Sequence, residues 1–307
     1  MSHDHQSHAH SAHGNSPASC GRAFAIGIAL NLAYVAGEAV AGIISGSLAL
    51  LADAGHNLSD VLGLSLSWGA AVLSRRQPSG RFTYGLRSSS ILAALANAII
   101  LLVVTGGIAW EAIWRIAHPV PIASGIVVVV AAIGIFINGG TALLFASGSA
   151  DLNIKSAFLH LAADALVTAG VVVAGIVIWL TDWRWLDPAV SLFVSAVIVL
   201  GTWGLFKSAI GLALNAVPER VDAAAVRAHL LALPGVAGLH DLHIWGMSTT
   251  ETALTCHLIM PAGHPGDTVL NEMAQQLHHW FGIQHATIQI ELADSDEACA
   301  LTPEHVV

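Results

Sequence analysis

Two pairs of histidine and aspartate residues, far apart in the chain, have the composition of a metal site. His56 precedes Asp60 by four residues, and His160 precedes Asp164 by the same interval. Residues at i and i+4 lie on one face of a helix, so each imidazole points the same way as its carboxylate. Two neutral imidazoles and two carboxylates are a donor set that suits tetrahedral Zn²⁺. The spacing therefore predicts a four-ligand zinc site built by two helices.

Both pairs lie inside apolar segments, and this decides between two interpretations. In a soluble helix, such a pair is usually an ordinary hydrogen bond or a solvated ion pair. At membrane depth, each ionised carboxylate costs about 3 kcal/mol or more to insert, so a functional role is favoured. Asp53 and Asn57 lie on or close to the face of His56 and are candidates for an outer shell, with a structural hydrogen bond as the alternative for Asp53. Glu38 is expected to form an interhelical hydrogen bond.

The composition places the chain among integral membrane proteins. Of its 307 residues, 55% are hydrophobic and only 10% are charged, which is more apolar sequence than one soluble core requires. The formal net charge of −9 gives no indication of a nucleic-acid partner. The cysteines Cys20, Cys256 and Cys299 include no C-x-x-C pair, so they indicate neither a disulfide framework nor a zinc ribbon.

Six apolar runs of at least about 20 residues are each long enough to cross the hydrocarbon core as a helix. They form a predicted transmembrane domain, residues 22–214, with spans at 22–44, 48–74, 87–116, 122–147, 153–181 and 187–213. Asp187 and Pro188 are expected to start the last helix, with Asp187 as its N-cap. Of the eleven Lys and Arg residues, nine fall in the loops and ends on one side of the membrane, and only Arg115 and Arg184 fall on the other side. Because cytoplasmic loops collect basic residues, both termini are predicted to be cytoplasmic.

The beginning of the chain is polar and rich in histidine. Residues 1–21 offer nothing that could form a core, and they lack the basic and apolar regions of a signal peptide. We interpret them as a disordered tail that collects metal ions, with an inert tail as the alternative. The histidines of this tail are His3, His5, His8, His10 and His13.

Hydropathy falls after residue 214, where a soluble domain of residues 215–293 is predicted. Its periodicity predicts a helix at 223–233, strands at 238–247 and 250–260, a helix at 266–280 and a strand at 285–292. The order α-β-β-α-β fits a small α+β sandwich with two helices on one face of three strands. Residues 294–307 form an acidic tail.

The strands of this domain supply a second candidate metal site. His240 and His243 are three positions apart on a strand, so they are expected to face opposite sides. The adjacent residues Cys256 and His257 are expected to do the same. Taking one residue from each predicted strand gives a candidate regulatory zinc site, with solvated histidines as the alternative. Its ligands are His240, His257 and Glu291.

Several motifs together resemble those of the cation diffusion facilitator family, in its bacterial and vesicular zinc-transporter branch. They are Ser45–Asp60, Tyr84-Gly-Leu-Arg87, His160–Asp164, Asp187-Pro188 and His240-Asp-Leu-His-Ile-Trp245. The resemblance covers about residues 20–292. It implies a homodimeric, proton-coupled exporter of cytoplasmic zinc, whose ion is held by His56, Asp60, His160 and Asp164. It also implies a ferredoxin-like cytoplasmic domain that dimerises and binds zinc.

The resemblance also bears on selectivity. Relatives with Asp at position 56 are associated with broader metal selection, so His56 favours zinc, with other divalent cations such as Cd²⁺ or Co²⁺ as alternative cargoes. Some relatives carry a further zinc site between spans 2 and 3, but residues 74–84 contain neither Asp nor His. Histidine must be unprotonated to bind metal, so zinc and protons compete for the same atoms. A zinc/proton antiporter of the inner (plasma) membrane is therefore expected.

Two other classes of function would use similar residues. An intramembrane metalloenzyme would also place His and Asp in spans, but H-E-x-x-H and the histidine boxes of a di-iron oxygenase are not in the sequence. A metal sensor would use the soluble domain and would need no ligand pairs in the spans. Transport is the preferred function, and we expect no enzymatic activity.

Overall fold

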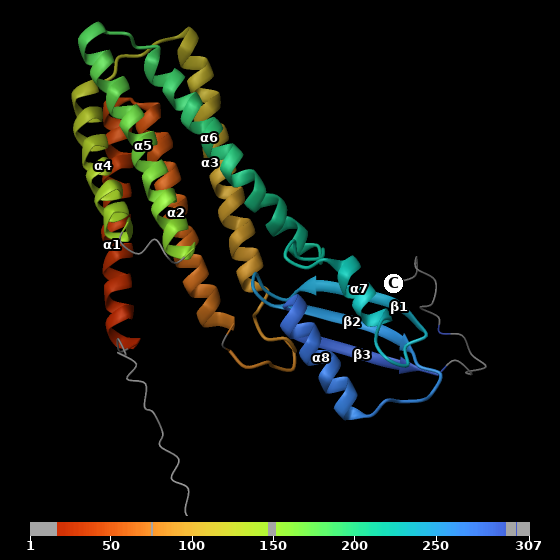
Figure 1. Cartoon of the computed structure of the whole chain (residues 1–307). Coiled ribbons are helices and arrows are strands. Elements are labelled where there is room, and N and C mark those ends of the chain that lie inside the picture. The colour runs from red at the N-terminus through yellow and green to blue at the C-terminus, as the bar shows by residue number, and fades with distance from the viewer. Residues whose placement is uncertain (1–16, 75, 147–151, 293–298, 300–307) are drawn as a thin grey trace, which may run out of the picture.

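The computed structural model describes residues 17–74, 76–146, 152–292 and 299. Six long helices come first and a small α+β unit follows them (Figure 1). The helices are α1 (Pro17–Ser45), α2 (Leu48–Ser74), α3 (Ser89–Ala117), α4 (Ser124–Ala146), α5 (Leu152–Thr181) and α6 (Leu186–Ala213). Except for the start of α1, each helix begins and ends within two residues of the corresponding end of its predicted span.

α1 begins earlier than its predicted span. Residues 17–21, assigned from the sequence to the disordered tail, form the first part of α1, so the prediction is wrong there. Pro17 stands at the helix start, where its fixed φ and missing N–H are favourable. The five histidines of the predicted tail lie outside the described residues.

Three helices in the described part of the chain are long and apolar enough to cross a membrane. They are Ser89–Ala117, Ala162–Thr181 and Leu186–Ala213. Two shorter apolar helices are Asn31–Ser45 and Ser124–Gly139. α2 is as long as these helices, but it carries the polar residues of the proposed metal site.

α2 lies in the middle of the bundle, in contact with α1, α3, α5 and α6. α3 and α6 run side by side, and α4 packs along α5 and α1 (Figure 1). Residues on α2 can therefore meet partners from four different helices.

The N-terminus of α2 is held by a side chain from α6. The Asp187 carboxylate accepts hydrogen bonds from the amides of Leu48 at 2.8 Å and Ala49 at 3.4 Å, and also from Ser47 Oγ. α6 does start here, at Leu186, but the prediction that Asp187 caps its own helix is wrong. The first amides of α2 lack intrahelical acceptors, and this buried carboxylate supplies them.

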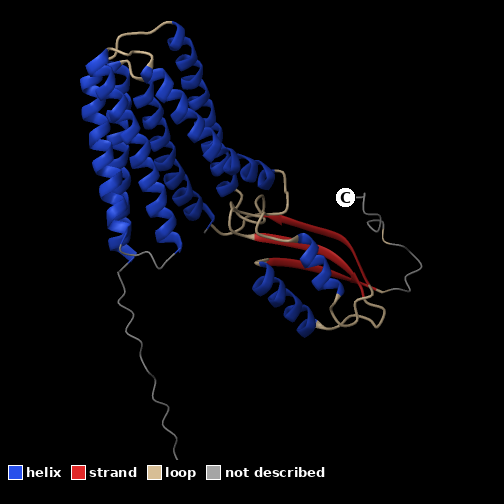
Figure 2. Cartoon of the chain, turned by 45° about the horizontal axis from the view of Figure 1, so that its top comes forward, coloured by secondary structure: helices blue, strands red, loops and turns tan. Residues whose placement is uncertain are grey.

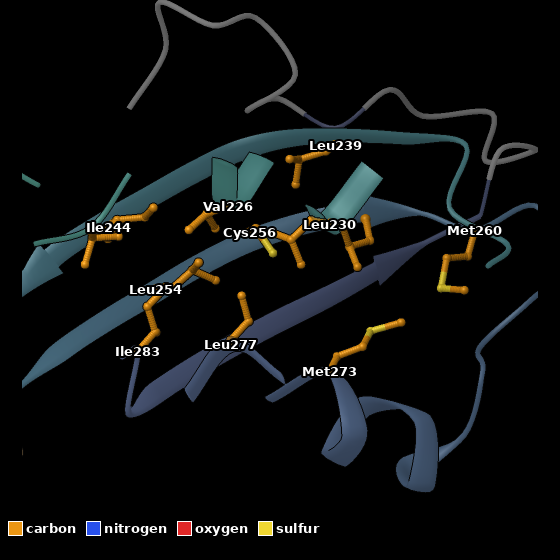
Figure 3. Packing of buried hydrophobic residues seen from close by; sticks show 12 residues of the cluster. Val226, Leu230, Leu239, Ile244, Leu254, Cys256, Met260, Met273, Leu277 and Ile283 are labelled. Atoms are coloured by element: carbon orange, nitrogen blue, oxygen red, sulfur yellow. The ribbon is translucent and has the colours of Figure 1, made fainter. Parts of the chain in front are cut away.

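The α+β unit has the predicted element order: α7 (Ala223–Leu231), β1 (Gly238–Gly246), β2 (Thr252–Ile259), α8 (Asp267–Phe281) and β3 (His285–Glu291). Its sheet, shown in Figure 2, has the order β1-β2-β3, with an antiparallel pair β1–β2 and a parallel pair β2–β3. Side chains of α7 and α8 pack against one face of the sheet in a single core, which includes Val226, Leu230, Leu254, Cys256, Met273 and Leu277 (Figure 3). The opposite face is left for polar residues.

The turn between β1 and β2 contacts the start of α3. Arg87 Nη1 donates a hydrogen bond to Glu251 Oε1 at 2.6 Å, and the Thr249 amide donates to Ser90 Oγ at 3.1 Å. These contacts join the α+β unit to the helix that packs along α6.

Candidate metal centres

His56 of α2 and Asp164 of α5 meet inside the helix bundle. His56 Nε2 lies 3.0 Å from Asp164 Oδ1, and Asp164 is 6% exposed. Two ligands of a tetrahedral zinc ion, each about 2.0–2.1 Å from the metal, are roughly 3.4 Å apart. The observed separation is therefore close to what a shared metal ion requires.

The other two predicted ligands occupy matching positions one helical turn away. Asp60 follows His56 on α2 and His160 precedes Asp164 on α5, but the side chains of Asp60 and His160 lie outside the described part of the structure. α2 starts and α5 ends at the end of the bundle where α6 begins, so the two helices are antiparallel. The helix positions of Asp60 and His160 are therefore at a common level, about 6 Å nearer the α+β unit.

A cavity of about 370 Å³ lies beside the His56–Asp164 contact. Its walls come from α2, α3, α5 and α6. At the edge of the cavity, Asn97 Nδ2 on α3 donates a hydrogen bond to Ser59 Oγ on α2 at 3.2 Å. Since a water molecule occupies about 30 Å³, the cavity has room for an ion with part of its hydration shell.

Asp53 and Asn57 contact groups other than the ligand side chains. Asn57 Nδ2 donates to Glu38 Oε2 at 3.1 Å, which is the interhelical hydrogen bond predicted for Glu38. Asp53 Oδ2 accepts from Thr168 Oγ1 at 2.9 Å, and the same hydroxyl lies 2.9 Å from the backbone carbonyl of Asp164. Thr168 therefore links Asp53 to the backbone of Asp164, one of the predicted ligands.

A second cluster lies on the sheet face that the helices leave open. Glu291 bridges two histidines: its Oε2 lies 2.9 Å from His240 Nε2, and its Oε1 lies 2.7 Å from His257 Nδ1. Cys299 joins them, with Sγ 3.7 Å from His257 Nδ1. One donor atom from each of the four residues lies within 4.8 Å of the others. This set of nitrogen, oxygen and sulfur donors fits zinc.

Glu291 and Cys256, on opposite faces of the sheet, differ in protonation. Burial raises the pKa of Glu291, but hydrogen bonds from His257 and Cys299 and the nearby imidazoles outweigh it, so the pKa lies below its ordinary value. Burial, reinforced by the charge of Asp241, raises the pKa of Cys256 to about 12. Cys256 therefore stays a thiol in the core, opposite His257, and is not a ligand.

The prediction that His240 and His243 face opposite sides is wrong. His240 pairs with His257 and His243 pairs with Thr255, so three steps on β1 match two steps on β2. The extra residue makes a β-bulge, where Asp241 has a left-handed φ of 50°. A bulge shifts the alternation by one, which brings both histidines to one face. There, Asp241 lies 2.8 Å from His243 Nε2 and 3.4 Å from His257 Nε2.

Sequence reasoning missed Asp241 and Cys299. The adjacency of Asp241 to His240 was a usable signal, because carboxylates commonly orient histidine ligands. Cys299 follows the last strand by several residues, and no spacing rule connects it to His257.

Two family models match the chain. The cation efflux transmembrane domain matches residues 24–212, and the cytoplasmic domain of cation efflux proteins matches residues 218–293. The chain belongs to the cation efflux family, the cation diffusion facilitators. This confirms the resemblance that the motifs indicated.

Known relatives match this cation efflux protein over most of their length. The metal cation efflux system protein CzcD of Cupriavidus metallidurans is 37% identical over 281 residues, which cover 91% of this chain and 89% of CzcD. The zinc transporter ZitB of Escherichia coli is 35% identical, with 87% and 86% covered. The cadmium, cobalt and zinc/H⁺-K⁺ antiporter of Bacillus subtilis is 32% identical, with 84% and 85% covered.

One solved structure matches only the end of this cation efflux protein. It is the metal-bound C-terminal domain of the CzcD transporter from C. metallidurans, which is 45% identical. The match covers 24% of this chain and 100% of that one, with a TM-score of 0.22.

Proposed function

We propose that the protein exports Zn²⁺ from the cytoplasm across the inner (plasma) membrane in exchange for protons. The observation that carries this proposal is the 3.0 Å contact between His56 and Asp164, which joins two helices beside a cavity. Relatives named as a zinc transporter and as a cadmium, cobalt and zinc antiporter support the same activity. Cd²⁺ and Co²⁺ are therefore further candidate cargoes.

The transported ion is held by four ligands, His56, Asp60, His160 and Asp164. Two carboxylates balance the double charge of the ion, which reduces the unfavourable free energy of placing it in an apolar bundle. Two imidazoles add borderline nitrogen donors, which favour zinc over harder cations.

Protons are the proposed counter-ion, because they bind the same atoms as the metal. His56 Nε2 and Asp164 Oδ1 are within hydrogen-bonding distance, so a proton can occupy the contact that zinc must replace. Zinc binding from the cytoplasm then releases protons, and protons from a more acidic compartment displace zinc on the other side.

We assign six membrane spans, with both termini in the cytoplasm. The outer surface of the bundle supports contact with lipid, since large apolar side chains face outward. Those that are 75–80% exposed include Trp110, Phe136, Leu180 and Leu200. Such a surface is unfavourable in water and favourable in a bilayer.

The α+β unit is the proposed cytoplasmic domain, with a ferredoxin-like fold, and it joins two copies of the chain as a homodimer. The match to the family's cytoplasmic domain supports this assignment. We further propose that His240, His257 and Glu291, with Cys299, bind a regulatory zinc ion. The histidines of residues 1–16 would raise the local concentration of zinc near the entrance, since a tether changes effective concentration.

Zinc flux into proteoliposomes, with an imposed pH gradient, tests the proposal. Asp164→Asn keeps the size of the side chain and one acceptor oxygen but removes the charge of one ligand, so zinc flux should be lost. Asp182→Asn is the matched control: Asp182 lies in the loop before α6, is exposed, and pairs with Arg184 at 2.8 Å. Normal flux in Asp164→Asn, or equal loss in both variants, would contradict the assignment.

A further inference from the structure

Glu38 of α1 and Asp53 of α2 form a buried carboxyl pair beside the metal ligands. Each residue is 1% exposed, and the two carboxyl groups are in hydrogen-bonding contact. Glu38 accepts hydrogen bonds from Tyr34 Oη and Asn57 Nδ2, both at 3.1 Å. Asp53 Oδ2 accepts one from Thr168 Oγ1. Among the described residues, no Lys or Arg pairs with either carboxyl group.

Two adjacent carboxylates without a cation are unstable in an apolar bundle. Both desolvation and mutual repulsion disfavour the doubly ionised pair, so one proton is retained between two such groups. Asp53 Oδ1 is buried and receives no hydrogen bond from a donor of the described residues. If the pair carries a proton, Asp53 Oδ1 can hold it and is then no longer a buried acceptor without a hydrogen bond.

The hydroxyl of Thr168 points to the same conclusion. Thr168 Oγ1 lies 2.9 Å from Asp53 Oδ2 and 2.9 Å from the carbonyl oxygen of Asp164, four residues earlier on α5. A hydroxyl group has one proton, so the two acceptors compete for it. Threonine in a helix commonly donates to the carbonyl at i−4. The hydrogen bond that Asp53 accepts from Thr168 is therefore weakened by this competition, which leaves a negative charge on Asp53 poorly compensated and favours a proton there.

We propose that Glu38 and Asp53 together bind one proton, at a site separate from the four metal ligands, and that zinc binding releases this proton. The release depends on the proposed transport function, whereas the presence of the proton depends on the carboxyl pair alone. Glu38, with two neutral donors, is the member suited to carry the remaining negative charge.

The location of the pair suits exchange with the side of the membrane away from the cytoplasmic domain. Asp53 precedes His56 on α2 and lies about 4.5 Å nearer the end where α6 begins. The titratable groups that face the pair are Tyr34 from α1, His56 from α2 and Asp164 from α5. A zinc ion at His56 and Asp164 adds positive charge one turn away, which favours ionisation of the pair.

Two measurements on the full-length, detergent-solubilised protein test this inference. Infrared spectroscopy of the zinc-free protein at neutral pH reports the carbonyl band of a protonated carboxyl group. Calorimetry of zinc binding in buffers of different ionisation enthalpy counts the protons released. Asp53→Asn should remove the band and lower the release by about one proton per chain. The matched control is Glu111→Gln, which neutralises a half-buried carboxylate that, unlike the pair, has a cationic partner, Arg115, at 2.9 Å on α3; it should change neither readout.

A second variant separates a protonated pair from a merely structural one. Thr168→Val keeps both carboxyl groups but removes the hydroxyl, so it should shift the infrared band without abolishing it.

An unchanged band in Asp53→Asn would overturn the proton site. Loss of the band with unchanged proton release would overturn the exchange with zinc. If wild-type protein failed to transport zinc, the proposed function would fail, while the infrared band would still decide whether the pair holds a proton.

Discussion

The two candidate metal centres use similar donors on different supports. His56 and Asp164 come from two helices that are joined by side-chain contacts, His56 with Asp164 and Asp53 with Thr168. His240, His257 and Glu291 come from three adjacent strands of one sheet. Backbone hydrogen bonds fix the strand register, so the sheet keeps its ligands at constant spacing. Helices in a membrane are joined only by side-chain contacts, so their spacing can change.

The difference indicates what each centre can do. A carrier has to release its ion on the side opposite to where it was bound, which requires supports that can move relative to one another. A regulatory site has to report the zinc concentration, and a rigid support on one side of the membrane suits that task. Arg87 Nη1 donates a hydrogen bond to Glu251 Oε1, which joins the start of α3 to the α+β unit.

The largest expected effect separates the two centres directly. His56→Ala should reduce zinc flux in proteoliposomes by more than about 100-fold, because ligand removal exceeds the usual effect of outer-shell changes. His240→Ala should retain transport and change only its dependence on the zinc concentration at the cytoplasmic face. Equal loss of flux in the two variants would show that both centres belong to the carrier mechanism.

The next effect concerns metal selection. His56→Asp replaces a borderline nitrogen with a hard oxygen and adds a negative charge, so the preference for zinc over Cd²⁺ should fall by roughly tenfold. The matched variant His257→Asp makes the same chemical change on the sheet and should leave the transported metal ratio unchanged. A competition assay with both metals measures this ratio. If only His257→Asp altered it, selection would take place in the cytoplasmic domain.

The sequence predicted what depends on local pattern. Apolar runs placed the ends of α2 to α6 because each run is bounded by polar or turn-forming residues. Alternation correctly assigned Cys256 and His257 to opposite faces of β2. The i, i+4 spacing selected His56 and Asp164, whose side chains lie 3.0 Å apart although α2 and α5 are far apart in the chain. That the two bind one metal ion stays a prediction.

The features that the sequence did not reveal depend on tertiary contacts or on one inserted residue. Asp187 caps α2, although the first turn of α2 lies well over a hundred positions earlier in the chain. It can do so because its buried carboxylate reaches amide groups of another helix. The bulge at Asp241 places His243 on the face opposite to the predicted one. Strand periodicity assumes strict alternation, so it cannot predict an extra residue. Contact between Glu38 and Asp53 requires α1 and α2 to pack with these positions facing each other.

The smallest expected effect tests whether the sheet is stable without metal. The hydrogen bonds from His257 and Cys299 hold the pKa of Glu291 below its ordinary value. A carboxyl group with a lowered folded-state pKa contributes stability above its unfolded pKa of about 4.3, and this contribution is lost as pH falls through the folded pKa. Glu291→Gln should therefore destabilise the sheet at neutral pH, by less than about 1 kcal/mol, and the difference from wild type should close below about pH 4.

Hydrogen–deuterium exchange of β1 to β3 peptides, in the full-length protein with a chelator present, measures this difference. Glu272→Gln serves as the control, since Glu272 is an exposed residue of α8. The variant at Glu291 should exchange faster than wild type at neutral pH and at the same rate in acid. A difference that widened on acidification would have the wrong sign for a stabilising carboxylate. It would show that the histidines, rather than Glu291, control the stability of this face. The proposed contrast between a rigid sheet and a movable helix bundle would then fail.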